Sequence, residues 1–390
     1  MEWNYIHRAV CSIRNLLFSK VPSFFSCRIG AKAIEVVKVF FPCMSNALLF
    51  GLIILGNVNL AAGNTNNLPL HHTDSGFKNN YLPEERMSKS LGTVFKWRFT
   101  RNSQEKVKFQ SVEPDIDFLK SNSTEETLTW IGHSTFLWQF GGINLITDPH
   151  LTERASPVGF AGPKRIMEPS ITLDDLPELD VVVISHNHYD HLDKKSVLGI
   201  TERQKDNAPL FLVPLGMKEW FADIGIKEKV VELDWWQSYE LGEWKYHAVP
   251  VQHWSRRGLL DTNEVLWCGW VVEAPGKRLF FAGDTGYSND FKDIGKRFPQ
   301  MDLSLIPIGA YAPRWFMKDM HCNPEEAVQI HLDVKSQKSI GMHWGTFLDL
   351  TDEPLEEPPL KLAKFLEKRG IDKRKFFTMK HGETLKFKEE

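Results

Sequence analysis

The sequence predicts an α/β protein in which sheets and helices are stacked in layers. From Thr127 onward, short apolar segments of strand-like composition follow one another closely. Further along the chain, such segments alternate with segments of helical pattern, which is typical of layered α/β folds. Polar, chemically reactive residues stand directly after several of the apolar segments, at the sheet edge where α/β proteins commonly bind ligands.

The first predicted strands lie around a hairpin. Residues 127–131 and 136–140 are rich in β-branched and aromatic side chains, which favour strands. Gly141-Gly142 then predicts a tight turn into a return strand at 143–147. The apolar run 181–184 is bounded by polar residues and predicts a buried strand.

The later elements follow from the same criteria. Asn323 and Pro324 precede two glutamates, a pattern that predicts a helix with Asn323 as its N-cap. The remaining elements are predicted as strands at 210–214, 230–233, 244–251, 265–273, 278–281, 303–308 and 339–342, and helices at 194–206, 217–224, 323–332 and 360–369.

The chain is predicted to have three parts. Residues 1–62 form a basic and apolar leader, because six Lys or Arg precede the apolar core at 47–55. This leader resembles a signal peptide or membrane anchor; a membrane-lying helix, a buried helix and a true start at Met44 are alternatives. Residues 63–85 read as a linker in which a His-His pair is solvated, and 86–390 form the main domain, beginning with a short helical arm at 86–126.

Composition limits the partners and the chemistry. The net charge of the 390 residues is −3. Because the leader is net positive, the rest of the chain is net acidic. An acidic body disfavours a nucleic-acid groove, which needs clustered cations. Five cysteines without a CxxC pair exclude a thiolate metal site of the common kind.

The most informative stretch is 185–193, which holds three histidines and two acids directly after the predicted strand 181–184. His186, His188, Asp190 and His191 are all potential metal ligands. Neutral imidazole and carboxylate suit zinc, and sites with three protein ligands leave a coordination position open for catalysis. A polar surface loop is the alternative, but histidine rarely clusters in this way without a metal.

Three further ligand-type residues stand in a similar context. His253, Asp284 and His343 each follow a predicted apolar strand. A single such residue is more often structural than functional. Together with the loop at 186–191, however, they would converge at one edge of the layered sheets and complete a set for two metals.

Several motifs carry a resemblance to a known family. The HxHxDH loop stands here as His186-Asn187-His188-Tyr189-Asp190-His191 and resembles that of the metallo-β-lactamase superfamily. The flanking motifs resemble its N-acylphosphatidylethanolamine-specific phospholipase D branch. These motifs are WIGHST at 130–135, TDP at 147–149, FAGDTGY at 281–287, IGAY at 308–311, HCNPEEA at 321–327 and HWGT at 343–346. The resemblance covers residues from about 90 to about 385.

The resemblance implies an αββα sandwich with two Zn²⁺ per chain. In this family one zinc would be held by His186, His188 and His253, and the other by Asp190, His191 and His343. Asp284 would bridge the two ions, and Asp148 and Asp193 would orient ligand imidazoles.

The implied reaction is hydrolysis of N-acyl-phosphatidylethanolamine to N-acylethanolamine and phosphatidic acid. A hydroxide between the zinc ions would attack the phosphodiester, with Asp284, Asp190 and His321 as catalytic residues. A dizinc lactonase or another ester hydrolase of the superfamily remains the main alternative. A nuclease is disfavoured by the acidic body, a di-iron enzyme by His188, where a carboxylate would be expected, and a non-enzymatic scaffold by the complete ligand set.

Substrate contacts are expected from His321, Tyr311, Trp315 and Phe160, although His321 could equally be a structural residue at a helix entry. Phe160 follows Gly159 where animal members of the branch are expected to have a Gln-Tyr pair, so headgroup contacts would differ here. Apolar residues near the ligands could line an acyl groove, touch a membrane or belong to the core; these are Trp254, Leu259, Leu260, Phe316 and Met317. The expected partners are a phospholipid and a membrane surface, with no nucleic acid, and a homodimer is compatible with the sequence.

Overall fold

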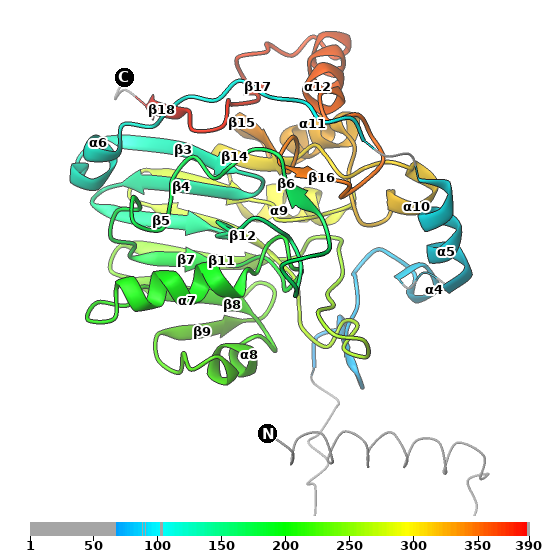
Figure 1. Cartoon of the computed structure of the whole chain (residues 1–390), viewed down its shortest axis with the longest axis horizontal. Coiled ribbons are helices and arrows are strands. Elements are labelled where there is room, and N and C mark those ends of the chain that lie inside the picture. Colours follow the sequence, from blue (N-terminus) through cyan, green and yellow to red (C-terminus); the bar gives the residue numbers. More distant parts are fainter. Residues whose placement is uncertain (1–67, 88, 90, 102–103, 388–390) are drawn as a thin grey trace, which may run out of the picture. The chain divides into compact units, whose positions relative to one another are not determined.

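The computed structural model describes residues 68–387 except 88, 90, 102 and 103. From Leu68 the chain forms one compact unit. The predicted leader, 1–62, lies outside the described residues, as does the first part of the predicted linker. Two seven-stranded sheets pack face to face, and helices cover their outer faces (Figure 1).

The first sheet has the order β18-β3-β4-β5-β7-β8-β9. Its strands are β3 (Glu126–Gly132), β4 (Thr135–Phe140), β5 (Ile143–Thr147), β7 (Val181–Val183), β8 (Leu210–Pro214), β9 (Val230–Leu233) and β18 (Thr384–Phe387). Strands β18 to β5 pair antiparallel, and β5 to β9 pair parallel. The predicted hairpin at Gly141-Gly142 is confirmed, since it joins β4 to β5.

The second sheet has the order β10-β11-β12-β13-β14-β15-β17. Its strands are β10 (Ser238–Leu241), β11 (Trp244–Val249), β12 (Gly269–Ala274), β13 (Lys277–Phe281), β14 (Met301–Pro307), β15 (Ser336–Met342) and β17 (Phe376–Phe377). Its first four strands are antiparallel and the last four are parallel. Each sheet therefore has a parallel half, and several ligand loops leave the carboxyl ends of those parallel strands.

Alternation along single strands explains the layers. In β7, Val181 and Val183 belong to the core between the sheets, whereas Val182 belongs to the core under the helices. The first sheet is covered by α6 (Ile116–Ser121), α7 (Lys194–Arg203) and α8 (Lys218–Asp223), and the second by α9 (Asp290–Arg297), α11 (Pro324–Asp333) and α12 (Glu357–Lys368). A strand buried on both faces needs apolar residues at every position, which is why 181–184 reads as a continuous apolar run.

Several smaller elements frame the sandwich. Helix α11 begins with the predicted cap: the Asn323 side chain accepts from the Glu326 backbone, and the Glu326 side chain accepts from that of Asn323. The predicted arm at 86–126 consists of short helices rather than one. These minor elements are β1 (His72–Thr73), β2 (Gly76–Phe77), α4 (Glu84–Met87), α5 (Leu91–Thr100), β6 (Lys164–Arg165), α10 (Arg314–Met317) and β16 (Phe347–Leu348).

The described part of the predicted linker contacts Asp234, which lies between β9 and β10. His71 is buried and His72 half-buried, and both imidazoles contact the Asp234 carboxylate, so the expectation of a solvated His-His pair was wrong. The cause is a long-range contact over more than 160 positions, which local composition does not reveal. Among the described residues, no helix has both the length and the apolar character needed to cross a bilayer.

Candidate metal centre and active site

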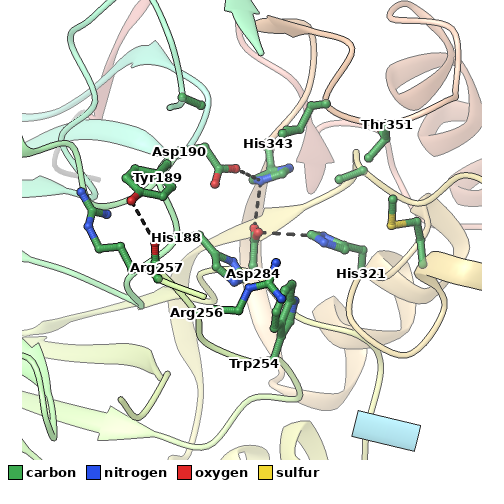
Figure 2. Close-up of a pocket in the computed structure, with 15 residues that line it drawn as sticks. His188, Tyr189, Asp190, Trp254, Arg256, Arg257, Asp284, His321, His343 and Thr351 are labelled. Carbon is green, nitrogen blue, oxygen red and sulfur yellow. Dashed lines mark hydrogen bonds and ion pairs between the residues drawn. The ribbon is translucent and has the colours of Figure 1, made fainter. Parts of the chain in front are cut away.

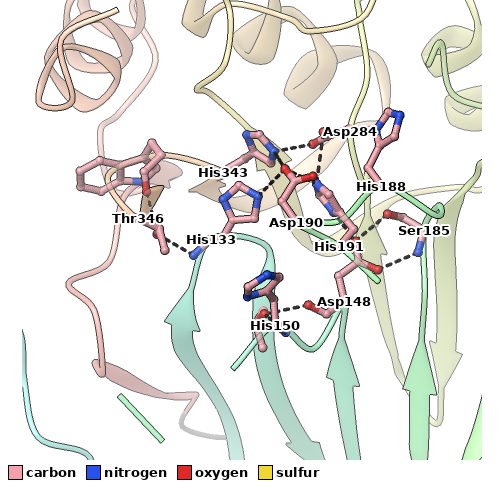
Figure 3. A network of polar contacts seen from close by, with 12 residues as sticks. His133, Asp148, His150, Ser185, His188, Asp190, His191, Asp284, His343 and Thr346 are labelled. Atoms are coloured by element: carbon pink, nitrogen blue, oxygen red, sulfur yellow. Dashed lines mark hydrogen bonds and ion pairs between the residues drawn. The ribbon is translucent and has the colours of Figure 1, made fainter. Parts of the chain in front are cut away.

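All seven predicted metal ligands lie together at one edge of the sandwich. Figures 2 and 3 label His188, Asp190, His191, Asp284 and His343 among them. The loop that carries residues 186–191 follows β7, and His253 lies in the loop after β11. Asp284 follows β13 and His343 follows β15. Because these strand ends meet at the same edge, the predicted convergence is confirmed.

Three imidazoles form the first ligand group. His186 Nε2 lies 2.8 Å from His188 Nδ1, which in turn lies 3.2 Å from His253 Nε2. On a tetrahedral zinc with bonds of about 2.1 Å, two ligand atoms are separated by roughly 3.4 Å. The three nitrogens are therefore spaced as ligands of one ion are.

Asp190, His191 and His343 form the second group. Asp190 Oδ2 lies 3.4 Å from Nε2 of each of the two histidines. The Asp284 carboxylate lies between the groups: its Oδ2 is 3.2 Å from His191 Nε2 and 3.8 Å from His253 Nε2, and its Oδ1 is 3.1 Å from His343 Nε2. Asp284 can thus serve both groups, as the resemblance implies.

Unpartnered buried atoms test whether these residues fit a metal cofactor. His191 Nε2, His343 Nε2 and Asp284 Oδ1 are buried without any hydrogen-bond partner. Buried polar atoms are rarely left unsatisfied, because each costs roughly 1–3 kcal/mol. Donor type, spacing and the unpartnered atoms all fit a metal centre with two neighbouring ions.

A second shell of hydrogen bonds orients the ligands. The Asp148 carboxylate accepts from His191 Nδ1 at 2.6 Å and from Ser185 Oγ at 2.5 Å (Figure 3). Ser185 Oγ in turn lies 2.9 Å from His186 Nδ1. These bonds hold the proton on Nδ1 and leave Nε2 of both rings for a metal.

The prediction for Asp148 is therefore confirmed. Asp193 differs, because its side chain accepts from the backbone of Lys195 and Ser196 and caps α7. It contacts no ligand imidazole in the structure, so its predicted role in orienting one was wrong.

Burial and neighbouring charges set the protonation of the ligands. Burial lowers the pKa of His186 and of His253 well below 6.5, so both rings are neutral at physiological pH. Burial would raise the pKa of the Asp190 and Asp284 carboxyls, but contacts led by His191 outweigh it and hold both well below the usual value. For His191 and His343, burial would lower the pKa, but the neighbouring carboxylates, led by Asp284, outweigh it and raise the pKa of His191 well above 6.5 and that of His343 to about 9. Since neutral imidazoles and ionised carboxylates are the forms that coordinate cations, a bound cation would displace one proton from each of these two rings.

A pocket of about 320 Å³ opens onto the ligand cluster. Figure 2 shows His321 and His343 pointing toward Asp284 in this pocket. Two arginines, Arg256 and Arg257, also line it. Burial lowers the pKa of Arg257 only to about 10, so its guanidinium group is cationic at neutral pH.

Comparison with known proteins agrees with this geometry. A family model described as "Beta-lactamase superfamily domain" matches residues 144–344. An N-acyl-phosphatidylethanolamine-hydrolyzing phospholipase D 1 of Caenorhabditis elegans is 43% identical over 268 residues, which cover 65% of this chain and 74% of that protein. The chain belongs to the metallo-β-lactamase superfamily, in the branch that resembles these phospholipases.

Two further proteins extend the comparison. The mitochondrial N-acyl-phosphatidylethanolamine-hydrolyzing phospholipase D of Saccharomyces cerevisiae is 38% identical over 253 residues, covering 63% of this chain and 53% of that protein. A metallo hydrolase of Ignicoccus hospitalis matches in structure with a TM-score of 0.51 and 22% identity, covering 68% of this chain and all of that one. The second match shows the fold, and the predicted αββα sandwich of the metallo-β-lactamase superfamily is confirmed.

His133, which stands in the WIGHST motif at 130–135, also contacts the ligand cluster. His133 Nε2 lies 3.0 Å from Asp190 Oδ2, and the His133 carbonyl accepts from the His343 backbone. His133 follows β3 at the same edge as the ligands, and this position after a strand was the available signal. It contacts two metal-ligand residues, so it belongs to the functional site.

The two pocket arginines had no signal in the sequence. They belong to the loop after His253, where neither periodicity nor spacing fixes the direction of a side chain. Arg257 is held in place because its Nη1 donates to the Asn187 carbonyl at 2.9 Å and its guanidinium lies 4.2 Å from the Tyr189 ring centre.

The predicted substrate contacts are only partly brought together. His321 lines the pocket, with its Nδ1 3.9 Å from Asp284 Oδ2. Tyr311 is buried with its hydroxyl on Glu357, and neither it nor Trp315 or Phe160 is among the residues that line the pocket. The substrate roles of Tyr311, Trp315 and Phe160 stay predictions.

Proposed function

We propose that the protein is a dizinc phosphodiester hydrolase of the phospholipase D type that cleaves N-acyl-phosphatidylethanolamine to N-acylethanolamine and phosphatidic acid. The observation that carries this proposal is that two arginines line the same pocket as four of the seven proposed metal ligands, His188, Asp190, Asp284 and His343. Metals beside fixed cations match the charge of a phosphodiester. The names of the relatives from Caenorhabditis elegans and Saccharomyces cerevisiae support the same substrate.

The residues that would hold the cofactor follow from the distances. His186, His188 and His253 would bind one zinc, and Asp190, His191 and His343 the other, with Asp284 shared. Bound zinc would supply a nucleophilic water at neutral pH and Lewis acidity toward the phosphoryl group. The protein contributes the orientation of the ligand imidazoles, which hydrogen bonds from Asp148 and Ser185 fix.

His321 is placed to act on the leaving group or on a phosphoryl oxygen. Its Nδ1 has no hydrogen-bond partner, and its side chain is about 15% exposed at the pocket. Burial lowers the pKa of His321 to about 4, so the ring is neutral at physiological pH. A neutral imidazole can donate one hydrogen bond and accept another, which suits the departing N-acylethanolamine oxygen.

The pocket rim has the character expected for a lipid substrate. Leu259 and Leu260 follow the arginine pair after Gly258 and are 92% and 85% exposed. Trp254 and Met317 line the pocket itself. We propose that the arginines receive phosphate oxygens while the apolar rim meets acyl chains at a membrane surface. The predicted homodimer also stays a proposal.

The test is product identification in isotopically labelled water. Purified protein is incubated with N-acyl-phosphatidylethanolamine dispersed in detergent, in H₂¹⁸O, and both products are analysed by mass spectrometry. Attack at phosphorus places one ¹⁸O in phosphatidic acid and none in N-acylethanolamine. Zinc content is measured on the same preparation.

An acyl lactone and an unacylated phosphatidylethanolamine serve as parallel substrates. The proposal predicts turnover of the N-acyl phospholipid that depends on metal. Turnover of the lactone alone would replace the proposed phospholipase by an ester hydrolase of the same superfamily, with the same ligands.

A further inference from the structure

The backbone of the metal ligand His253 is held by a side chain from far away in the sequence. Asn79 Nδ2 donates to the His253 carbonyl at 2.8 Å, and the His253 amide donates to Asn79 Oδ1 at 3.0 Å. Trp267 Nε1 also donates to Asn79 Oδ1, at 3.2 Å. Asn79 is 4% exposed, so this amide group pairs with the ligand in a dry environment.

His253 is also held through its ring. Its Nδ1 donates to the Met320 carbonyl at 2.8 Å, so Nε2 is the nitrogen left for a metal. Together with the two Asn79 bonds, this contact fixes the ligand at three points. A shift of the 253 backbone would carry Nε2 away from His188 Nδ1, which lies 3.2 Å from it.

The segment that carries Asn79 is anchored to Asp234 through two imidazoles. Nε2 of His71 lies 2.6 Å from Asp234 Oδ1, and Nε2 of His72 lies 2.8 Å from Asp234 Oδ2. These are hydrogen-bond distances, and each imidazole contacts a different oxygen of the Asp234 carboxylate, so two contacts tie this segment to Asp234. The His71 ring also stacks on Trp235, with 4.4 Å between ring centres.

The other side of the same segment is anchored separately. Asn80, the neighbour of Asn79 in sequence, points to α9 rather than to the metal centre: its Nδ2 donates to Asp290 Oδ1 at 2.8 Å. The backbone of Phe77 donates to the Asn263 carbonyl. The chain before the catalytic sandwich is therefore fixed on both sides of Asn79.

We propose that Asn79 is a positioning residue of the metal centre, which acts by holding His253 in the geometry that completes the three-histidine group. This inference rests on the proposed metal-dependent function. Outer residues that orient metal ligands typically change metal affinity by about 10–100-fold when they are replaced. The expected loss should fall on the ion held by His186, His188 and His253.

The experiment compares two changes at Asn79 with one at its neighbour. Asn79→Leu keeps the size of the side chain and removes both hydrogen bonds, and Asn79→Ala serves if leucine prevents folding. Asn80→Leu is the matched control, because it removes an amide anchor from the same segment without touching a metal ligand. Zinc per chain is measured during chelator competition, and Co²⁺ spectra report the coordination of each ion.

The expected result is that an Asn79 variant loses one of two ions at about 10–100-fold lower chelator concentration, whereas Asn80→Leu keeps both. Excess zinc should restore kcat of the Asn79 variant with KM unchanged. Wild-type metal affinity in the Asn79 variants, or an equal loss in Asn80→Leu, would overturn the inference while leaving the proposed function intact.

Two other outcomes separate the inference from the function. A wild-type protein that binds two ions but cleaves no phospholipid would refute the proposed substrate, and the Asn79 result would still stand. A wild-type protein without metal would refute both.

Discussion

Replacement of Asp148 by asparagine should weaken the metal centre without removing a ligand. The fully buried Asp148 carboxylate receives three hydrogen bonds: from the Ser185 amide at 2.7 Å, from Ser185 Oγ at 2.5 Å and from His191 Nδ1 at 2.6 Å. In Asp148→Asn, Oδ1 can still accept from the Ser185 amide. The new NH₂ group would face two former donors in place of Oδ2.

The magnitude follows from the tautomer of His191. The ring can recover a hydrogen bond from the new NH₂ group only by accepting at Nδ1, which moves its proton to Nε2 and blocks metal binding there. Loss of such an outer-shell partner typically costs about 10–100-fold in metal affinity, or roughly 1.4–2.7 kcal/mol. His186 should be affected less, because Ser185 stands between it and Asp148.

The assay is zinc retention against a graded chelator, with thermal unfolding of the metal-free protein as a check on the fold. Asp193→Asn is the matched control: it is also an acid near the ligand loop, but it caps α7, and asparagine caps helices about as well as aspartate. The control should retain metal like the wild type. If Asp148→Asn retained both ions with wild-type affinity, the assigned role of Asp148 would be refuted.

Three further predictions concern activity and pH. His188→Ala and Asp284→Ala should each abolish turnover in a phospholipid assay while the fold persists by circular dichroism, and full activity in either folded variant would refute the ligand assignment. Arg256→Ala should raise KM for the N-acyl phospholipid by roughly tenfold through loss of a charge-assisted hydrogen bond, with kcat changed less, and an unchanged KM would remove Arg256 from the substrate site. His331 is buried beside Ser339 Oγ, and burial lowers its pKa to about 4. The unfolded chain therefore binds one more proton than the folded chain between about pH 6.5 and 4. As the pH falls through that window, the free energy of unfolding should decrease by an amount on the order of 3 kcal/mol. Denaturant titrations of His331→Asn should show a weaker fall over the same window, and an identical slope would contradict this origin.

The metal ligands could be predicted from sequence because each one is tied to a local pattern. The loop 186–191 follows an apolar run that can only be a doubly buried strand, and its spacing places several ligands in one turn of chain. His253, Asp284 and His343 also follow apolar segments, so knowledge of the layers is enough to bring them to one edge. The position of a residue at the end of a predicted strand can therefore be placed in the fold from sequence alone.

The missed features depend on contacts between distant segments. Strand β18 has a short, mixed sequence and is defined by its pairing with β3, across more than 250 positions. His71 and Asn79 likewise acquire their roles only from Asp234 and His253. No local pattern distinguishes an asparagine that clamps a metal ligand from one in a solvated linker, because both obey the same turn preferences.

The metal ligands and the exposed residues near the pocket lie in different environments in this fold. This difference explains why the ligand positions could be predicted from sequence more completely than the substrate contacts. Five of the seven ligands are exposed by 3% or less, in surroundings where each polar atom needs a partner and the choice of residue is tightly limited. Phe160, Leu259 and Leu260 are more than 80% exposed, so the folded chain itself places few demands on them. Their identity is then set by what they meet outside the chain, and it is at such positions that members of one metal-dependent family can differ in substrate while retaining the same ligands.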